Sequence, residues 1–367
     1  MYRINEKRLV KTFVDMAKIS SPSWHEGGMI DYMTGAARKA GLKVRKFPCG
    51  GSHNLLLQLS GDEKKRPVLF SAHMDTVTPC DRVRPVVSHT KITSDGTTIL
   101  GSDDKAAIAM FLEAARYIQE TGMPHLPVEI LVTCAEEVGL KGAKCFDMSL
   151  LRSRYAFVFD CDGPVGKIVL QAPYQSTIGI SVTGRAAHAG MEPEKGINAI
   201  NVLSEIITRL PSGRVDHETT MNVGTVSCGR ANNIVAENAS CLLETRSLDR
   251  NKLKKQESLI RSTAKETATR LGARCTVKSE LEYSGFIIHP SDTVPRIAVG
   301  AMERAGIRHH FEVSGGGSDT NIFNRAGIKA INLSAGMRNV HTPKEYIMIR
   351  DLVNGAKVAI SIIDSTR

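Results

Sequence analysis

The segment VLFSAHMDTV, from Val68 to Val77, leads a run of apolar residues into a histidine and an aspartate. The apolar run predicts a buried β-strand, with His73 and Asp75 at its end. In a parallel α/β sheet, functional sites form outside the carboxyl ends of the strands. A single His-x-Asp also arises by chance, so the rest of the chain must show whether His73 binds a metal and Asp75 holds its imidazole.

The surrounding sequence predicts more strands of the same kind. VEILVTCAEEVG (128–139) and YAFVFDCDG (155–163) are nearly continuously apolar at their starts, as in a sheet that is covered on both faces. Between the strands, residues 103–122 predict a long helix with acidic residues in its first turn and a closing Gly122. Strands that alternate with helices indicate an α/β domain with a central, mostly parallel sheet.

The pattern changes near residue 175. The next segments predict the order βαββαβ, which is the ferredoxin-like arrangement, before α/β character returns. We therefore expect one domain formed by residues 1–175 and 287–367, with residues 176–286 inserted as a separate domain.

Composition narrows the class of protein. A hydrophobic content of 42% and a charged content of 23% are typical of a globular domain, and no apolar run reaches the ~18 residues of a membrane span. The net charge is +10, but its Lys and Arg residues are spread along the chain without interleaved aromatics, which favours solvated surface charge over nucleic-acid binding. The eight cysteines form no CxxC pair, and the first residues show no signal peptide, so we expect free thiols and a cytoplasmic protein.

Further metal-type side chains follow other strands or lie in loops. Each has an ordinary explanation by itself: acids favour helix starts and turns, and a loop histidine is common at a surface. Several such residues at strand ends are explained more simply by one site. The candidates are Asp103 and Asp104, Glu136 and Glu137, Asp160 and Asp162, and His341.

The candidate ligands offer only oxygen and nitrogen atoms. Two histidines with several carboxylates suit Zn²⁺, Mn²⁺ or Co²⁺, and a shared carboxylate suits two ions about 3.5–4 Å apart. The sequence therefore predicts a site for two transition-metal ions.

Seven motifs in this order resemble the M20 metallopeptidases, and within them the peptidase T-like tripeptidase branch. The match extends over essentially the whole chain and consists of SAHMDTV, LGSDDKAAIA, TCAEEVGLKGA, FDCDGPVG, GRAAHAGMEPEKGINAI, GGGSDTN and HTPKE. The resemblance implies a catalytic α/β domain with two metal ions and an inserted domain that dimerises and acts as a lid.

The resemblance also implies the metal ligands. Asp162 lies only two residues after Asp160 and stays an alternative to it. The implied set is His73 and Asp160 for one ion, Glu137 and His341 for the other, and Asp103 bridging the two.

The resemblance also implies roles for two residues near these ligands. Asp75 would orient His73, because a carboxylate that bonds a metal-binding imidazole fixes the orientation of its ring. Glu136 would be the general base that takes a proton from the attacking water. The glycine-rich SGGGSDTN lacks the Lys-Ser/Thr of a phosphate loop and is expected to line the substrate cleft.

The inserted domain contributes the remaining candidates. His188 in GRAAHAG resembles the histidine that reaches the active site of a partner subunit, where it would stabilise the oxyanion. Asn233 and Arg246 resemble residues that bind the substrate's carbonyl or carboxylate, and Arg suits a carboxylate through two parallel hydrogen bonds. The alternatives are an ordinary loop histidine and an exposed arginine without a function.

The resemblance, added to the candidate ligands, implies a homodimeric zinc aminopeptidase that acts on tripeptides. We expect no nucleic-acid or membrane partner. Another M20-type amidohydrolase, such as a dipeptidase, carboxypeptidase or N-acyl-amino-acid deacylase, would use the same ligands. A metal-binding scaffold without activity is the third alternative, and it would have no use for Glu136.

Overall fold

The computed structural model describes residues 2–364, and the chain forms two compact units. The larger unit consists of Met1–Leu170, Ile287–Ser314 and Ser318–Arg367. The smaller unit consists of Gln171–Phe286 and Gly315–Gly317. The smaller unit is therefore an insertion in the sequence of the larger one.

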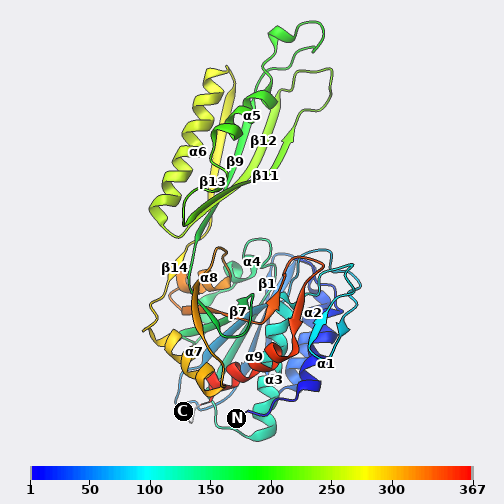
Figure 1. Ribbon diagram of the computed structural model, residues 1–367, viewed down its shortest axis with the longest axis vertical. Helices are drawn as coiled ribbons and strands as arrows, with labels where there is room; N and C mark the ends of the chain where they lie inside the picture. Colours follow the sequence, from blue (N-terminus) through cyan, green and yellow to red (C-terminus); the bar gives the residue numbers. More distant parts are fainter. Residues whose placement is uncertain (1, 365–367) are drawn as a thin grey trace. The chain divides into compact units, whose positions relative to one another are not determined.

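A nine-stranded sheet runs through the larger unit (Figure 1). Its centre is parallel, in the order β6, β3, β7 and β16. Antiparallel pairing flanks this centre, with β2 against β6 on one side and β8 against β16 on the other. The strands are β1 (Lys43–Cys49), β2 (Ser52–Leu59), β3 (Val68–His73), β6 (Val128–Thr133), β7 (Tyr155–Cys161), β8 (Lys167–Ala172), β14 (Phe286–Ile287), β15 (His310–Val313) and β16 (Lys329–Ser334).

Both faces of this sheet are buried. In β3, Val68 and Phe70 belong to one hydrophobic cluster, whereas Leu69 between them belongs to another. In β6, Ile130 and Leu131 divide between the two clusters in the same way. Because successive side chains of a strand point to opposite faces, a sheet covered on both faces needs apolar residues at almost every position.

Helices provide the cover on each face. The first cluster includes residues of α1 (Glu6–Ala17), α2 (Gly27–Lys39), α3 (Ser102–Thr121), α7 (Thr293–Arg304) and α9 (Ile349–Ile363). The second cluster includes Phe323 of α8 (Asp319–Arg325) and Phe146, which follows α4 (Lys141–Cys145), and a short 3₁₀ turn η1 (Met148–Leu150) packs beside it.

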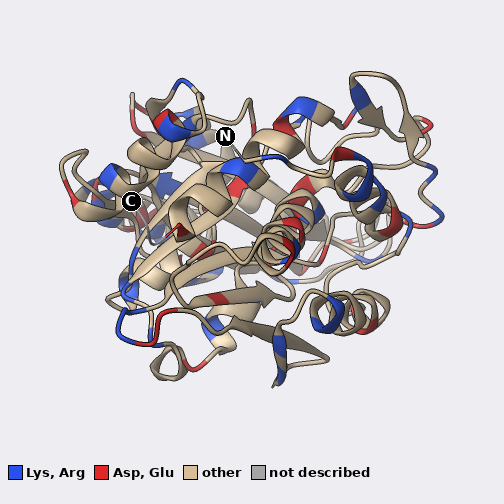
Figure 2. Cartoon of the chain, turned by 90° about the horizontal axis from the view of Figure 1, so that it is seen from below, with Lys and Arg blue, Asp and Glu red and all other residues tan. Residues whose placement is uncertain are grey.

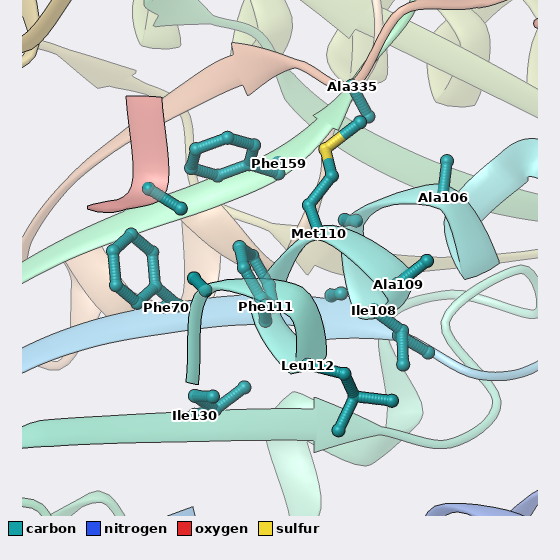
Figure 3. Close-up of a cluster of buried hydrophobic side chains, with 14 of the residues drawn as sticks. Phe70, Ala106, Ile108, Ala109, Met110, Phe111, Leu112, Ile130, Phe159 and Ala335 are labelled. Carbon is teal, nitrogen blue, oxygen red and sulfur yellow. The ribbon is translucent and has the colours of Figure 1, made fainter. Parts of the chain in front are cut away.

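Helix α3 is held against the sheet by aromatic contacts (Figure 3). The ring of Phe111 lies 5.0 Å from that of Phe70 in β3 and 5.2 Å from that of Phe159 in β7. Aromatic rings at these distances pack favourably beyond their buried area. This packing fixes the helix whose first turn contains the candidate site residues Asp103 and Asp104.

A second, four-stranded antiparallel sheet belongs to the larger unit. Its order is β17 (Met337–Arg338), β18 (Tyr346–Met348), β5 (Lys91–Thr93) and β4 (Val86–Val87). The loop 339–345 connects β17 to β18 and carries His341. Strands this short leave little periodicity in a sequence, and we did not predict this sheet.

The smaller unit has one antiparallel sheet with helices that share its hydrophobic core. The strand order is β10-β11-β12-β9-β13, and Ile178 and Ile180 of β9 pack in one cluster with Ile206 of α5 and Ile260 of α6. The elements are β9 (Tyr174–Thr183), η2 (Pro193–Lys195), α5 (Ala199–Arg209), β10 (Gly213–Arg214), β11 (Thr219–Cys228), β12 (Asn238–Ser247), α6 (Arg250–Arg270) and β13 (Arg274–Tyr283). The predicted fold class is confirmed, and the elements of residues 174–283 add the short 3₁₀ turn η2 and the two-residue strand β10 to the βαββαβ order.

Charged residues of both signs are interspersed over the helices and loops (Figure 2). Among residues 2–364, the structure has no helix long and apolar enough to cross a membrane. The expectation that nucleic acid is not a partner stays a prediction.

Candidate metal centre and active site

Strand ends of the central sheet bring the candidate ligands together. β3 ends at His73, β7 ends just after Asp160, and Glu136 follows β6 by three residues. These strands are parallel neighbours, so their carboxyl ends meet at one edge of the sheet. His73 and Glu136 are buried there, at 2% and 9% exposure.

Asp103 lies between the two histidines. Its Oδ1 is 2.9 Å from Nε2 of His73, and its Oδ2 is 3.2 Å from Nε2 of His341. Each histidine faces a second carboxylate, since Asp160 Oδ1 lies 3.7 Å from His73 Nε2 and Glu137 Oε1 lies 3.1 Å from His341 Nε2. The structure therefore brings all five predicted ligands into one cluster, with Asp103 shared by two histidine-carboxylate pairs.

This cluster has an excess of buried negative charge. Burial and the negative charge of Asp160 raise the pKa of Glu136 well above its ordinary value, and they do the same to Asp104. Both carboxylate oxygens of Asp104 are buried and have no hydrogen-bond partner. Buried carboxylates without balancing charge are costly, and a cation would relieve that cost. The donor set and its charge thus fit divalent metal ions.

The histidines show the complementary effect. Hydrogen bonds to Asp103 and Glu137 raise the pKa of His341 to about 10. Burial lowers the pKa of His73, but the carboxylates of Asp103 and Asp75 outweigh it, and the pKa stands well above its ordinary value. The same contacts, mainly with His341, hold the pKa of Asp103 below its usual range despite burial. Metal ions bind neutral imidazole, so they would take the place of these protons.

Asp75 connects His73 to the two glutamates. The main-chain oxygen of Asp75 lies 2.9 Å from His73 Nδ1, and its carboxylate Oδ1 lies 3.5 Å from the same atom. The carboxylate accepts hydrogen bonds from Ser23 Oγ (2.7 Å), Glu136 N (2.9 Å) and Glu137 N (3.2 Å). Asp75 thus contacts the imidazole and also positions the main chain of both glutamates. The sequence did not reveal its contacts with the glutamates.

A second buried acid holds the turn that precedes Glu136. Ala135 has a φ of +48°, in the left-handed region that residues other than glycine rarely adopt. Its N–H donates to Glu26 Oε1 at 3.0 Å, and Glu26 is fully buried. Such backbone conformations persist where the surrounding structure enforces them, often at functional sites. Glu26 gave no signal in the sequence, because it lies 109 residues away.

The alternative ligand Asp162 lies apart from the cluster. Its carboxylate accepts a hydrogen bond from Lys167 Nζ at 2.5 Å, and its side chain is 59% exposed. The main chain of Asp160 is fixed by Asn332, which accepts from Asp160 N at 3.0 Å and donates to its carbonyl at 2.8 Å. The geometry places Asp160, and not Asp162, beside His73.

A model of the peptidase family M20/M25/M40 matches residues 69–365. The chain belongs to this family. It is 35% identical to a tripeptidase from Staphylococcus aureus subsp. aureus Mu50, with a TM-score of 0.92 and 98% of each chain covered. It is also 35% identical to the aminopeptidase PepT from Bacillus cereus ATCC 10987, with a TM-score of 0.88 and the same coverage.

Among relatives known by sequence, the uncharacterized protein YqjE from Bacillus subtilis (strain 168) is 37% identical over 98% of this chain and 99% of its own length. The family match and the two solved structures confirm the resemblance to M20 metallopeptidases of the peptidase T type, and the protein is a hydrolase of peptide bonds.

The glycine-rich loop of this M20 peptidase leads into α8. Ser318 caps that helix through Thr320 N, and Asp319 Oδ2 accepts a hydrogen bond from Thr133 Oγ1 at 2.6 Å. Burial raises the pKa of Asp319 to about 6, and its Oδ1 is buried without a partner. The contact ties the start of α8 to the end of β6, three residues before Glu136.

His188 and Asn233 of the M20 peptidase lie in adjoining loops of the smaller unit. Nδ1 of His188 accepts hydrogen bonds from the N–H groups of Gly190 and Met191, each at 3.2 Å. The carbonyl of Asn233 accepts from Ala189 N at 3.0 Å. Both candidate side chains are exposed, and their roles stay predictions.

Arg246 already binds a carboxylate. Its Nε and Nη2 each donate to Glu244 at 3.0 Å, and Gln175 Nε2 donates to Glu244 Oε2 at 2.9 Å. A substrate carboxylate would have to share the guanidinium with Glu244, whose presence beside Arg246 the sequence analysis missed. The role of Arg246 in substrate binding also stays a prediction.

Proposed function

We propose that this M20 peptidase is a two-metal aminopeptidase that releases the N-terminal residue of tripeptides, with zinc as its metal and manganese or cobalt as possible substitutes. The observation that carries the metal proposal is the position of Asp103, whose two oxygens contact different histidines that each face a second carboxylate. Similarity to a tripeptidase and to an aminopeptidase supports the substrate class.

The proposed ligands are those that the cluster contains. His73 and Asp160 would hold one ion, Glu137 and His341 the other, and Asp103 both. Bound ions of this kind supply Lewis acidity, which polarises a scissile carbonyl and makes an attacking water more acidic.

Glu136 would transfer a proton from the attacking water to the leaving amine. Its carboxylate is buried beside the cluster, and its main chain is fixed by Asp75, so it can accept a proton from the attacking water. The same carboxylate would return that proton to the leaving amine. Asp75 would act through the positions of His73 and Glu136.

The smaller unit would complete the enzyme. We propose that it acts as the lid and dimerisation domain, that His188 stabilises the oxyanion in a partner subunit, and that Asn233 and Arg246 bind the substrate. The eight cysteines are free thiols, which supports a reducing compartment such as the cytoplasm.

A panel of small peptides tests this proposal. Purified protein would be stripped of metal, reloaded with Zn²⁺, Mn²⁺ or Co²⁺, and incubated with di-, tri- and tetraalanine and with N-acetylated trialanine. We expect release of the N-terminal residue from trialanine and no cleavage when the N-terminus is blocked. Glu136→Gln, loaded in the same way, is the control for contaminating peptidases.

The same panel separates the alternatives. Preferred cleavage of dialanine would indicate a dipeptidase, and release from the C-terminus would indicate a carboxypeptidase. Release of acetate from N-acetylated trialanine, without cleavage of the unblocked peptides, would indicate a deacylase. Any of these results would replace the tripeptide proposal, while failure of every substrate with every metal would remove it.

A further inference from the structure

Glu345 is a buried carboxylate beside the metal cluster that none of the proposed roles uses. Its side chain is 1% exposed. Oε2 accepts hydrogen bonds from the N–H groups of Leu100 (2.7 Å) and Gly101 (2.8 Å). Oε1 accepts from Ser102 N (2.6 Å), Ser102 Oγ (2.5 Å) and Asp103 N (3.2 Å). One carboxylate thus binds four consecutive main-chain N–H groups.

These N–H groups need a partner from outside the helix. Asp103 has a ψ of 103° and Asp104 a φ of −120°, so the regular turns of α3 begin only after them. The N–H groups that precede a regular helix have no carbonyl partner within it, and successive N–H groups in a turn form a concave site for an anion. Glu345 occupies that site, and it fixes the segment that ends in the shared carboxylate of Asp103.

Glu345 also belongs to the loop that carries His341. Glu345 N donates to Thr342 O at 3.0 Å, and Thr342 Oγ1 donates to Asn339 O at 2.7 Å, so the loop 339–345 is tied to itself. His341 adopts a φ of +63° within this loop, which shows how closely its conformation is constrained. Glu345 therefore closes the loop of His341 and also accepts a hydrogen bond from the main chain of Asp103.

We infer that Glu345 is a positioning residue of the metal centre, which couples the segment Leu100–Asp103 to the loop of His341. The inference rests on the proposed function for the identity of the two ligands. Through the two sets of contacts, Glu345 holds the shared carboxylate and one imidazole at a fixed separation. A Gln in its place would present an NH₂ group to N–H donors, which breaks the match on one side of the carboxylate.

The same chain offers a matched control. Glu129 in β6 is 2% exposed and also receives main-chain hydrogen bonds, from Arg152 N and Ser153 N, as well as 2.6 Å from Ser153 Oγ. It lies at the start of β6, whereas the metal cluster follows the end of that strand. Glu129→Gln therefore removes a buried carboxylate of similar chemistry without disturbing the ligands.

The experiment measures Co²⁺ binding alone, in the full chain, by competition with a chromogenic chelator and by visible absorption. We expect Glu345→Gln to bind Co²⁺ about 10–100-fold more weakly than the wild type, as is typical for residues that support metal ligands, and to change the Co²⁺ spectrum. Glu129→Gln should keep the wild-type Co²⁺ affinity and spectrum, even if its unfolding midpoint falls as far as that of Glu345→Gln. With a peptide that the wild type cleaves, kcat of Glu345→Gln should fall while KM changes by less than about twofold.

Ser102→Ala serves if Glu345→Gln does not fold, because it removes only the hydroxyl bond to Glu345. It should weaken Co²⁺ binding in the same direction by a smaller factor. Wild-type Co²⁺ affinity in a folded Glu345→Gln, equal losses in Glu345→Gln and Glu129→Gln, or wild-type affinity in Ser102→Ala when Glu345→Gln is unfolded would each overturn the inference. A wild type that binds Co²⁺ but cleaves no peptide would instead remove the proposed peptidase activity, and it would leave the metal ligands and this inference standing.

Discussion

His73 and His188, one from each unit, are held in opposite ways. Both ring nitrogens of His73 contact groups from Asp75 and Asp103, and the side chain is buried. Within residues 2–364, the hydrogen bonds that the ring of His188 accepts come from N–H groups of its own loop, and the residue is exposed. The larger unit thus has a cluster that its own fold preorganises, whereas His188 and Asn233 of the smaller unit lie exposed in loops.

The difference separates two kinds of function. A metal centre requires ligands that are already close together and supported by further hydrogen bonds. A group that contacts the substrate only during the reaction can lie in an exposed loop of the free enzyme, because catalytic contacts often form fully only in the enzyme–substrate complex. Each prediction below tests one side of this comparison.

Removal of metal should have the largest effect. The buried acids around Asp103 and Asp160 are expected to need cations for their function, so chelation should abolish hydrolysis of a peptide substrate. Addition of Zn²⁺, Mn²⁺ or Co²⁺ to the stripped protein should restore it. Metal analysis should find up to two ions per chain, and full activity in metal-free protein would contradict the proposed centre.

Glu136→Gln should lower kcat by about 10²–10⁴-fold, the range expected for loss of a general base. The substitution preserves the shape of the side chain, and the main-chain bond from Glu136 N to Asp75 does not depend on the carboxylate. Metal content should therefore stay at the wild-type value, as measured by elemental analysis.

Glu137→Gln is the matched control for that experiment. Its carboxylate contacts His341 at 3.1 Å, so this variant should lose one of the two ions. If Glu136→Gln lost metal while Glu137→Gln kept it, the roles assigned to the two neighbours would have to be exchanged.

Mixed dimers test the smaller unit. Glu136→Ala and His188→Ala dimers should each be nearly inactive if His188 serves the active site of a partner subunit. Equal mixing and random reassociation make half of the dimers mixed, and each mixed dimer has one site with both groups intact, so activity should recover to about a quarter of wild type. If no activity returned while mass spectrometry confirmed mixed dimers, His188 would either serve the active site of its own chain or have only a structural role.

The sequence revealed the parts of this site that depend on local pattern. His73, Glu137 and Asp160 each follow or end a strand that an apolar run predicts, and parallel pairing then brings them together. The βαββαβ order was visible for the same reason. These features need only the period of a strand or helix and the rule that sites form at carboxyl ends.

The supporting contacts could not be predicted in that way. Glu345 binds Leu100 across 245 residues, and Glu26 binds Ala135 across 109, so no local pattern indicates either pair. The sheet that carries the loop of His341 consists of strands of two or three residues, too short for a periodic signal. Side chains that bond to a distant main chain become visible only when the fold is known.

Substitution of Asp162 should have the smallest effect on metal content and activity, and it tests whether Asp162 lies outside the metal cluster. Asp162 is only two residues beyond Asp160, but its exposed carboxylate pairs with Lys167 instead of a histidine. The Lys167 side chain is mostly buried, but it also lies 3.5 Å from Glu312 and would keep that carboxylate as a partner. Asp162→Asn should therefore lower the unfolding midpoint by only a few degrees. It should keep both metal ions and change kcat by less than about twofold, because none of its contacts reaches the ligands.

Asp160→Asn should instead weaken binding of the ion at His73, whose Nε2 lies 3.7 Å from the Asp160 carboxylate. The two variants remove the same charge from neighbouring positions, so metal analysis of the pair distinguishes ligand loss from a general loss of negative charge. Metal loss in Asp162→Asn with retention in Asp160→Asn would transfer the ligand role to Asp162 and require the end of β7 to rearrange when metal binds.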